Sequence, residues 1–204
     1  MTHLIIGVCG RKRHGKDTIG NILRARYGFQ SCAFADPLKR VAMEIYGLTW
    51  NQCYGETEDK ESVDPRWGLS ARVILQKLGT DIARSIHEET WIKNTLNNIQ
   101  SACAGTGYIV RDDIGRKFVT RPNGISETAW VITDLRFPNE AEAIQRIGGR
   151  VIRVVRPSLG IPTDEHPSET SVDLVHPDIE IINDGDVLDL RHKLEAALNL
   201  RAAQ

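Results

Sequence analysis

A short apolar run followed at once by a glycine-rich, basic loop constrains this chain more than any other feature. The run covers residues 4–9, the loop reads Gly10-Arg11-Lys12-Arg13-His14-Gly15-Lys16, and Ile19, Ile22, Leu23 and Tyr27 then recur at helical spacing. Two glycines let backbone N–H groups converge on an anion, and the next helix adds unpaired N–H groups at its N-terminus. A strand, a loop of this kind and a helix therefore predict a phosphate-binding loop.

The predicted nucleotide-binding residues are the nine consecutive positions Gly10, Arg11, Lys12, Arg13, His14, Gly15, Lys16, Asp17 and Thr18. Lys16 is placed to neutralise the terminal phosphates. Asp17 stands where such loops commonly carry a serine or threonine that binds Mg²⁺. Asp17 can hold the metal directly or through water, Thr18 can take that role, or Asp17 can simply stabilise the helix dipole as an acid in the first turn.

Length and charge limit the partners. A chain of 204 residues can bury one good core with room for inserted segments, so we expect a single domain over residues 1–204. Its expected insertions are a substrate-binding excursion at about 48–68, a hairpin at 104–128 and a lid-like loop at 157–177. The formal net charge is −1, which predicts neither nucleic acid nor a membrane surface as a partner. Positive charge gathers in the loop, which indicates a small anion.

The cysteines and the N-terminus bear on the compartment. Cys9, Cys32, Cys53 and Cys103 form no C-x-x-C pair and no zinc pattern, so we expect reduced thiols in a cytosolic protein. The N-terminal apolar run is too short for a signal peptide, and there is no apolar run of 18 residues. We expect a cytoplasmic protein, in the host cytoplasm if it is phage-encoded.

Strand and helix patterns alternate along the chain, which predicts the α/β class, a parallel sheet with helices on both faces. The expected strands are at 4–9, 31–35, 130–134, 150–156 and 179–182. The expected helices are 16–27 with Gly28 as its stop, one from Asp36 as N-cap to Gly47, one capped by Ser70 and running to Ile86, one around 91–99, one from Asn139 with Glu142 in a capping box, and 187–198.

Ligands of parallel sheets gather where the strands end, so residues that follow different strands can converge. Gly10, Asp36, Asp134 and Arg156 all lie at the carboxyl ends of predicted strands. Asp134 is predicted to hold Mg²⁺ through water, and Arg136 to reach a phosphoryl group. The alternatives are that Asp134 caps a helix or turn and that Arg136 is an ordinary surface arginine.

Further polar residues are candidates for binding the second substrate. Lys39, in the first turn of a helix with Asp36, opposes the helix dipole, which a substrate phosphate would compensate. The polar residues Gln76, Thr80, Asp81 and Arg84 have nearly helical spacing, and Arg153 and Arg156 alternate along one strand. Each candidate has an alternative explanation. Asp36 can be a helix cap and Lys39 a solvated side chain. The residues from Gln76 to Arg84 can be a solvent-exposed helix face, and Arg153 and Arg156 a solvated sheet edge.

Five segments together resemble the bacteriophage-type deoxynucleoside monophosphate kinases. They are Gly-Arg-Lys-Arg-His-Gly-Lys-Asp-Thr (10–18), Phe-Ala-Asp-Pro-Leu-Lys (34–39), Leu-Gly-Thr-Asp-Ile-Ala-Arg (78–84) with Trp91, Thr-Asp-Leu-Arg-Phe-Pro-Asn-Glu (133–140) and Ile-Asn-Asp-Gly (182–185). The resemblance implies a P-loop nucleoside monophosphate kinase-like fold, a three-layer arrangement with lid and substrate-binding insertions. It also implies transfer of the γ-phosphoryl group of ATP, with Mg²⁺, to a deoxynucleoside monophosphate (dNMP).

Two other functions stay open at this point. The Gly-Lys-Asp loop is also similar to that of animal-type phosphomevalonate kinases, which share the reaction but not the acceptor base. A nucleotide-sensing P-loop module is the second alternative, and the many cations outside the loop speak against it. Which dNMP is accepted, and whether the chain forms a homodimer, are left open by the sequence.

Overall fold

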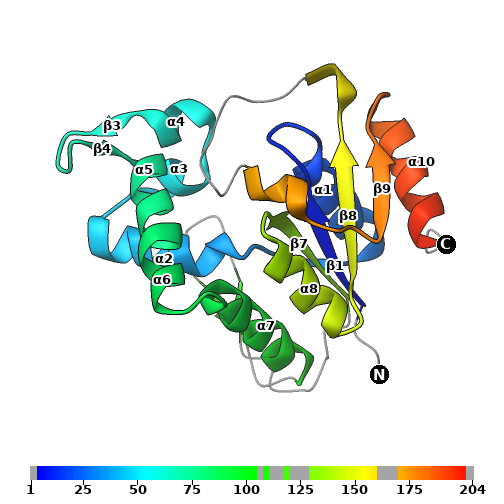
Figure 1. Cartoon of the computed structure of the whole chain (residues 1–204), viewed down its shortest axis with the longest axis horizontal. Coiled ribbons are helices and arrows are strands. Elements are labelled where there is room, and N and C mark those ends of the chain that lie inside the picture. The colour runs from blue at the N-terminus through cyan, green and yellow to red at the C-terminus, as the bar shows by residue number, and fades with distance from the viewer. Residues whose placement is uncertain (1–3, 105–107, 111–116, 120–128, 160–169, 201–204) are drawn as a thin grey trace. The chain divides into compact units, whose positions relative to one another are not determined.

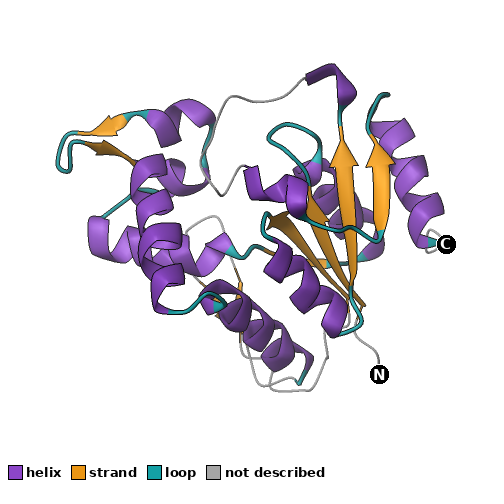
Figure 2. Cartoon of the chain, viewed as in Figure 1, coloured by secondary structure: helices purple, strands orange, loops and turns teal. Residues whose placement is uncertain are grey.

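The computed structural model describes residues 4–104, 108–110, 117–119, 129–159 and 170–200 (Figure 1). These residues divide between two compact units. The first unit is Met1–Ala33 with Ile125–Gln204, and the second is Phe34–Gly124. Figure 2 shows that the strands of the large sheet belong to the first unit, whereas the second is mainly helical.

The first unit contains a five-stranded sheet in the order β2-β7-β1-β8-β9, with every neighbouring pair parallel. Its strands are β1 (Leu4–Cys9), β2 (Gln30–Cys32), β7 (Ala129–Leu135), β8 (Arg150–Val155) and β9 (Ile179–Ile182). The predicted α/β class and parallel sheet are confirmed. Because β1 is the central strand, the loop that follows it lies at the middle of the sheet's carboxyl edge.

Helices cover both faces of this sheet (Figure 1). The helices α1 (Lys16–Tyr27) and α10 (Val187–Leu198) contact each other on one face, and α8 (Pro138–Arg146) packs on the other. Ile6 and Val8 of β1 share a buried cluster with Leu23 of α1 and Leu194 of α10. With both faces covered, β1 buries five consecutive residues, which is why it reads as a continuous apolar run.

The predicted bounds of α1, β9 and α10 are confirmed, and two predicted caps are wrong. Helix α2 (Ala35–Tyr46) begins at Ala35, so Asp36 lies inside its first turn instead of capping it, and β2 ends early at Cys32. At the start of α8, Glu140 takes the place predicted for Glu142. Its carboxylate accepts hydrogen bonds from the N–H groups of Arg136 (2.8 Å) and Phe137 (3.1 Å).

The second unit is built mainly from short helices and two small antiparallel pairs. Its elements are α2, α3 (Trp50–Tyr54), α4 (Thr57–Glu61), β3 (Val63–Asp64), β4 (Leu69–Ser70), α5 (Ala71–Gln76), a π-helix (Lys77–Ala83), α6 (Arg84–Ile86), α7 (Thr90–Cys103), β5 (Tyr108–Val110) and β6 (Lys117–Val119). Ala42, Leu48, Cys53, Ala71 and Ile74 form its buried cluster. Strands β5 and β6 pair antiparallel, while the rest of the predicted hairpin lies outside the described residues.

The long helix predicted from Ser70 to Ile86 is present, but a π-helical stretch interrupts it. The Ser70 hydroxyl accepts from the N–H of Val73 at 3.4 Å, as expected of an N-cap. In the π-helical part, the carbonyl of Gly79 accepts a hydrogen bond from the indole N–H of Trp91 at 2.9 Å. π-Helical stretches inside α-helices occur often at functional sites, and four of the predicted substrate residues lie in this stretch or directly beside it: Gln76, Thr80, Asp81 and Arg84.

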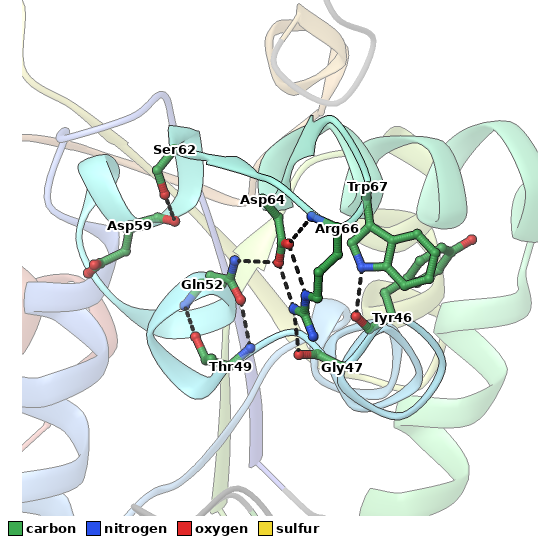
Figure 3. Close-up of polar contacts among 9 residues, drawn as sticks. All are labelled: Tyr46, Gly47, Thr49, Gln52, Asp59, Ser62, Asp64, Arg66 and Trp67. Carbon is green, nitrogen blue, oxygen red and sulfur yellow. Dashed lines mark hydrogen bonds and ion pairs between the residues drawn. The ribbon is translucent and has the colours of Figure 1, made fainter.

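A buried carboxylate organises the 48–68 excursion, which lies within the second unit (Figure 3). Asp64 accepts from the guanidinium of Arg66 at 2.9 and 2.6 Å, from the backbone N–H of Arg66 at 3.0 Å and from the Gln52 amide at 3.1 Å. Arg66 also donates to the carbonyl of Gly47 at 3.0 Å, where α2 ends. These hydrogen bonds connect both ends of the excursion through the Asp64 carboxylate and the Arg66 guanidinium. The Arg66 guanidinium holds the pKa of Asp64 well below its usual range.

We expect Asp64→Asn to lower the free energy of unfolding at pH 7 and to flatten its dependence on pH in acid. The carboxyl has a lower pKa folded than unfolded, where it is about 3.9. Its contribution is therefore complete well above pH 3.9 and is lost as the pH falls towards the folded pKa. Urea unfolding at pH 7, 5, 4 and 3 should show the gap between wild type and variant narrowing with acid. The exposed Asp81→Asn is the control, and a gap that stays constant with pH would contradict the expectation.

The predicted lid-like loop at 157–177 is described only at its two ends, as 3₁₀ turns at Pro157–Leu159 and Ser171–Leu174, and residues 160–169 lie outside the described residues. The four cysteines are free thiols, with Cys9 and Cys53 buried. In the part of the chain that the structure describes, no helix combines the length and apolar character needed to span a membrane.

Candidate phosphate-binding site

The loop between β1 and α1 adopts a backbone that only glycines take easily at two of its positions. Gly10 has φ 146° and Gly15 has φ 113°. The space beside them is also filled: a Cβ on Gly10 would lie 2.5 Å from the carbonyl oxygen of Val154, and one on Gly15 would lie 2.7 Å from Nδ2 of Asn183. The two glycines of the motif are therefore required by both conformation and close packing.

Lys16 folds back over this loop. Its ammonium group donates to the carbonyl oxygen of Arg11 at 2.9 Å, and the backbone N–H of His14 donates to the same oxygen at 3.2 Å. The loop thus closes on itself, with a half-buried cation held against its own backbone at the N-terminus of α1. A cation and helix N–H groups in this position favour a bound phosphate.

Arg11 connects the loop to the 3₁₀ turn at Ser171–Leu174. Its guanidinium donates to both carboxylate oxygens of Asp173, at 3.1 and 2.5 Å. Arg153 of β8 holds the same turn, since it donates to the carbonyl oxygens of Val172 (3.2 Å) and Val175. Arg153 is therefore engaged with the turn's backbone, while Lys12, Arg13 and Arg156 of the predicted set are exposed.

His14 is a buried, neutral residue of the loop. Burial lowers the pKa of its imidazole, and Nδ1 accepts from the backbone N–H of Arg156 at 3.2 Å. The proton of the neutral ring is then on Nε2, which is buried and has no hydrogen-bond partner among the described residues. An unsatisfied buried donor is costly, and a phosphate oxygen is the kind of acceptor that would satisfy it.

The strand β7 is irregular where it approaches the loop. Gly7 of β1 pairs with Ile132, but Cys9 pairs with Leu135, so two residues of β7, Thr133 and Asp134, lie along the stretch that Val8 spans alone. Irregularities of this kind re-aim side chains and are frequent beside active sites. Asp134 is half-buried near the end of this strand, and Arg136 lies just beyond it, in the short connection to α8.

The second unit places Asp36 and Lys39 around one aromatic ring. Asp36 is buried and accepts from the hydroxyl of Tyr54 at 3.2 Å, while Nζ of Lys39 lies 4.2 Å from the centroid of the same ring. Trp50 stacks on Tyr54 with centroids 4.0 Å apart. Gln76 ends α5, Thr80 and Asp81 lie in the π-helix, and Arg84 begins α6, where it donates to the carbonyl of Glu88 at 3.3 Å.

The two units divide the candidate residues between them. Gly10 to Thr18, Asp134, Arg136, Arg153 and Arg156 belong to the first unit, and Asp36, Lys39, Gln76, Thr80, Asp81 and Arg84 to the second. Among the residues with contacts in these clusters, Tyr54, Asp173 and Asn183 had no predicted role. Asn183 directly follows β9 at the carboxyl edge, a position that could have indicated it. Nothing in the sequence around Asp173 pairs it with Arg11.

Comparisons of the sequence with a family profile and with curated proteins point to one family. A sequence profile of the family "Deoxynucleotide monophosphate kinase" matches residues 51–194. A protein of Acanthamoeba polyphaga mimivirus, named for the same kinase, is 35% identical over 183 residues, covering 88% of each chain. A deoxynucleotide monophosphate kinase of Escherichia phage RB69 is 29% identical over 138 residues, which are 67% of this chain and 47% of the phage protein. Among solved structures, a dephospho-CoA kinase from Campylobacter jejuni aligns over 98% of this chain and 97% of its own, with TM-score 0.44 and 14% identity.

These matches differ in how much they cover. The chain spans about half the length of the phage kinase but most of the mimivirus protein. The family profile begins after the phosphate loop and covers more than half of the chain. The chain therefore belongs to the deoxynucleotide monophosphate kinase family and is an enzyme that transfers phosphoryl groups.

Proposed function

We propose that the chain transfers the γ-phosphoryl group of ATP to a deoxynucleoside 5′-monophosphate, giving the diphosphate and ADP. The observation that carries this proposal on the donor side is the loop from Gly10 to Thr18, with two left-handed glycines, a cation folded over it and the buried donor Nε2 of His14. Several convergent donors of this kind suit the terminal phosphates of a nucleoside triphosphate. Membership of the kinase family supports the acceptor.

On the donor side, we assign to Lys16 the role of neutralising the negative charge on the phosphoryl group that is transferred. Mg²⁺ in phosphoryl-transfer sites is held by one or two carboxylates together with substrate phosphates, not by a complete protein cage. Asp17, Thr18 and Asp134 supply oxygen ligands of the kind that Mg²⁺ takes, so these residues fit the ion. When bound, it would neutralise charge on the transferring phosphate. The irregular pairing of β7 supports Asp134 in this set.

On the acceptor side, phosphoryl transfer needs positioning more than covalent chemistry, because the acceptor phosphate is already a nucleophile. We assign its binding to the cations Arg136, Lys39 and Arg84. Asp36 and Tyr54, joined by a hydrogen bond, supply polar groups beside Lys39, and the Trp50–Tyr54 stack supplies an aromatic surface suited to a base. We include Gln76, Thr80, Asp81, Arg153 and Arg156 as further acceptor contacts.

A coupled assay of ADP release tests the proposal. The purified chain is given ATP and Mg²⁺ alone, then with each deoxynucleoside monophosphate, each ribonucleoside monophosphate and phosphomevalonate. We expect ADP release to depend on added deoxynucleoside monophosphate and to stop when EDTA removes Mg²⁺. Turnover with phosphomevalonate alone would assign the reaction to that acceptor. ADP release that no acceptor increases would indicate a nucleotide-sensing module and contradict the proposal.

A further inference from the structure

The side chain of Asn183 contacts the second half of the phosphate loop. This residue follows β9, is 6% exposed, and its backbone N–H donates to the carbonyl of Val155 in β8 at 2.7 Å. Its side-chain amide donates to the carbonyl oxygen of His14 at 2.8 Å. Since only the NH₂ group of the amide can donate to a carbonyl, this contact also determines which way the amide is turned.

Asn183 also fills the space beside Gly15. A Cβ on that glycine would meet Nδ2 of Asn183 at 2.7 Å and Cγ at 3.7 Å. The same stretch of loop is joined to β8 by the hydrogen bond from the N–H of Arg156 to Nδ1 of His14. Residues 14–15 are therefore hydrogen-bonded to residues at the carboxyl ends of β8 and β9. Asn183 supplies the hydrogen bond to the loop's own backbone.

The hydrogen bond to His14 has a direct consequence for the next N–H group. A trans peptide is planar, and its C=O and N–H point in opposite directions. With the His14 carbonyl held towards Asn183, the N–H of Gly15 points away from Asn183. Glycine at a positive φ has few steric restrictions, so without this bond the His14–Gly15 peptide can rotate and turn its carbonyl oxygen to the anion instead.

We propose that Asn183 is a positioning residue that holds the His14–Gly15 peptide so that the Gly15 N–H faces the phosphates of ATP. This inference rests on the proposed function, in which the loop binds ATP. It gives Asn183 no direct contact with the substrate. A carbonyl oxygen turned towards phosphate would repel it, whereas the N–H attracts it. The role of Asn183 is thus electrostatic and acts through the backbone of the loop.

The test replaces Asn183 by leucine, which branches at the same carbon but cannot donate. Loss of one hydrogen bond to a charged group predicts a decrease of about 10- to 100-fold in affinity for Mg²⁺-ATP and for inorganic tripolyphosphate, measured by calorimetry. In steady-state kinetics, KM for ATP should rise while KM for the acceptor, measured at saturating ATP, should not. Asn183→Ser, smaller and still able to donate, should lose less and guards against a leucine variant that fails to fold.

The matched control is Asp186→Ala, three residues away. The Asp186 side chain accepts from the N–H of Asp189 and caps α10, so its loss lowers the melting temperature without touching the loop. We expect this variant to keep its affinity for tripolyphosphate. Asn183→Leu and Asn183→Ser that bind ATP as wild type does, or an Asp186→Ala that loses as much affinity, would overturn the role of Asn183. A wild-type chain that binds no Mg²⁺-ATP would instead overturn the proposed function itself.

Discussion

Lys16→Met is expected to lower kcat by about 10²- to 10³-fold, the effect of removing one preorganised charge from a transferring group. Methionine keeps most of the length of the lysine side chain and removes only the cation. The fold should survive, because the hydrogen bond from Lys16 to the carbonyl of Arg11 is only partly buried and is worth about 1 kcal/mol. Initial rates at saturating ATP and acceptor, with urea unfolding in parallel, measure both effects.

Lys93→Met is the control for this experiment. Lys93 is a lysine of the exposed face of α7 that pairs with Glu89 at 3.7 Å, so its loss removes the same charge without entering the phosphate loop. Its kcat should equal that of wild type. Near-normal turnover of the Lys16 variant would remove the central role assigned to this residue, and equal losses in both variants would show a general effect of net charge.

Gly10→Ala is expected to be the most damaging single substitution of the loop. A backbone at φ 146° is strained for any residue other than glycine, at a cost of about 1–3 kcal/mol, and the new Cβ would lie 2.5 Å from the carbonyl oxygen of Val154, an atom of the central sheet that cannot easily move. Overpacking of this kind adds about 1–3 kcal/mol. The loop must shift to relieve the contact, so binding of ATP should be lost together with stability.

Gly148→Ala is the control for this substitution. Gly148 also has a positive φ, 81°, which strains a non-glycine backbone less than φ 146°, and nothing lies within 4 Å of its Cβ position, so this variant carries a smaller strain and no steric contact. The midpoint of urea unfolding should fall much further for Gly10→Ala than for Gly148→Ala, and only the former should lose affinity for ATP. Equal shifts in the two variants would contradict the expected effect of the backbone conformation and the Val154 contact at Gly10.

Some elements could be placed from the sequence because their signals are local. The helix Lys16–Tyr27 has a glycine stop at Gly28, and the helix Val187–Leu198 has an acid cap, so the predicted bounds hold to the residue. The start of α2 could not be placed in this way. Asp36 before Pro37 has the pattern of a cap, but Asp36 is instead buried in the first turn, where the hydroxyl of Tyr54 donates to it.

The sequence by itself determined the alternation of strands and helices, the glycine-rich loop and its lysine, because each depends on neighbours within a few residues. Only the tertiary structure decided which distant groups meet: Asn183 against Gly15, and Asp173 with Arg11. The physical reason is that a parallel sheet brings the ends of its strands together whatever their separation in the chain. Hydrogen bonds between such ends leave no periodic trace in the sequence.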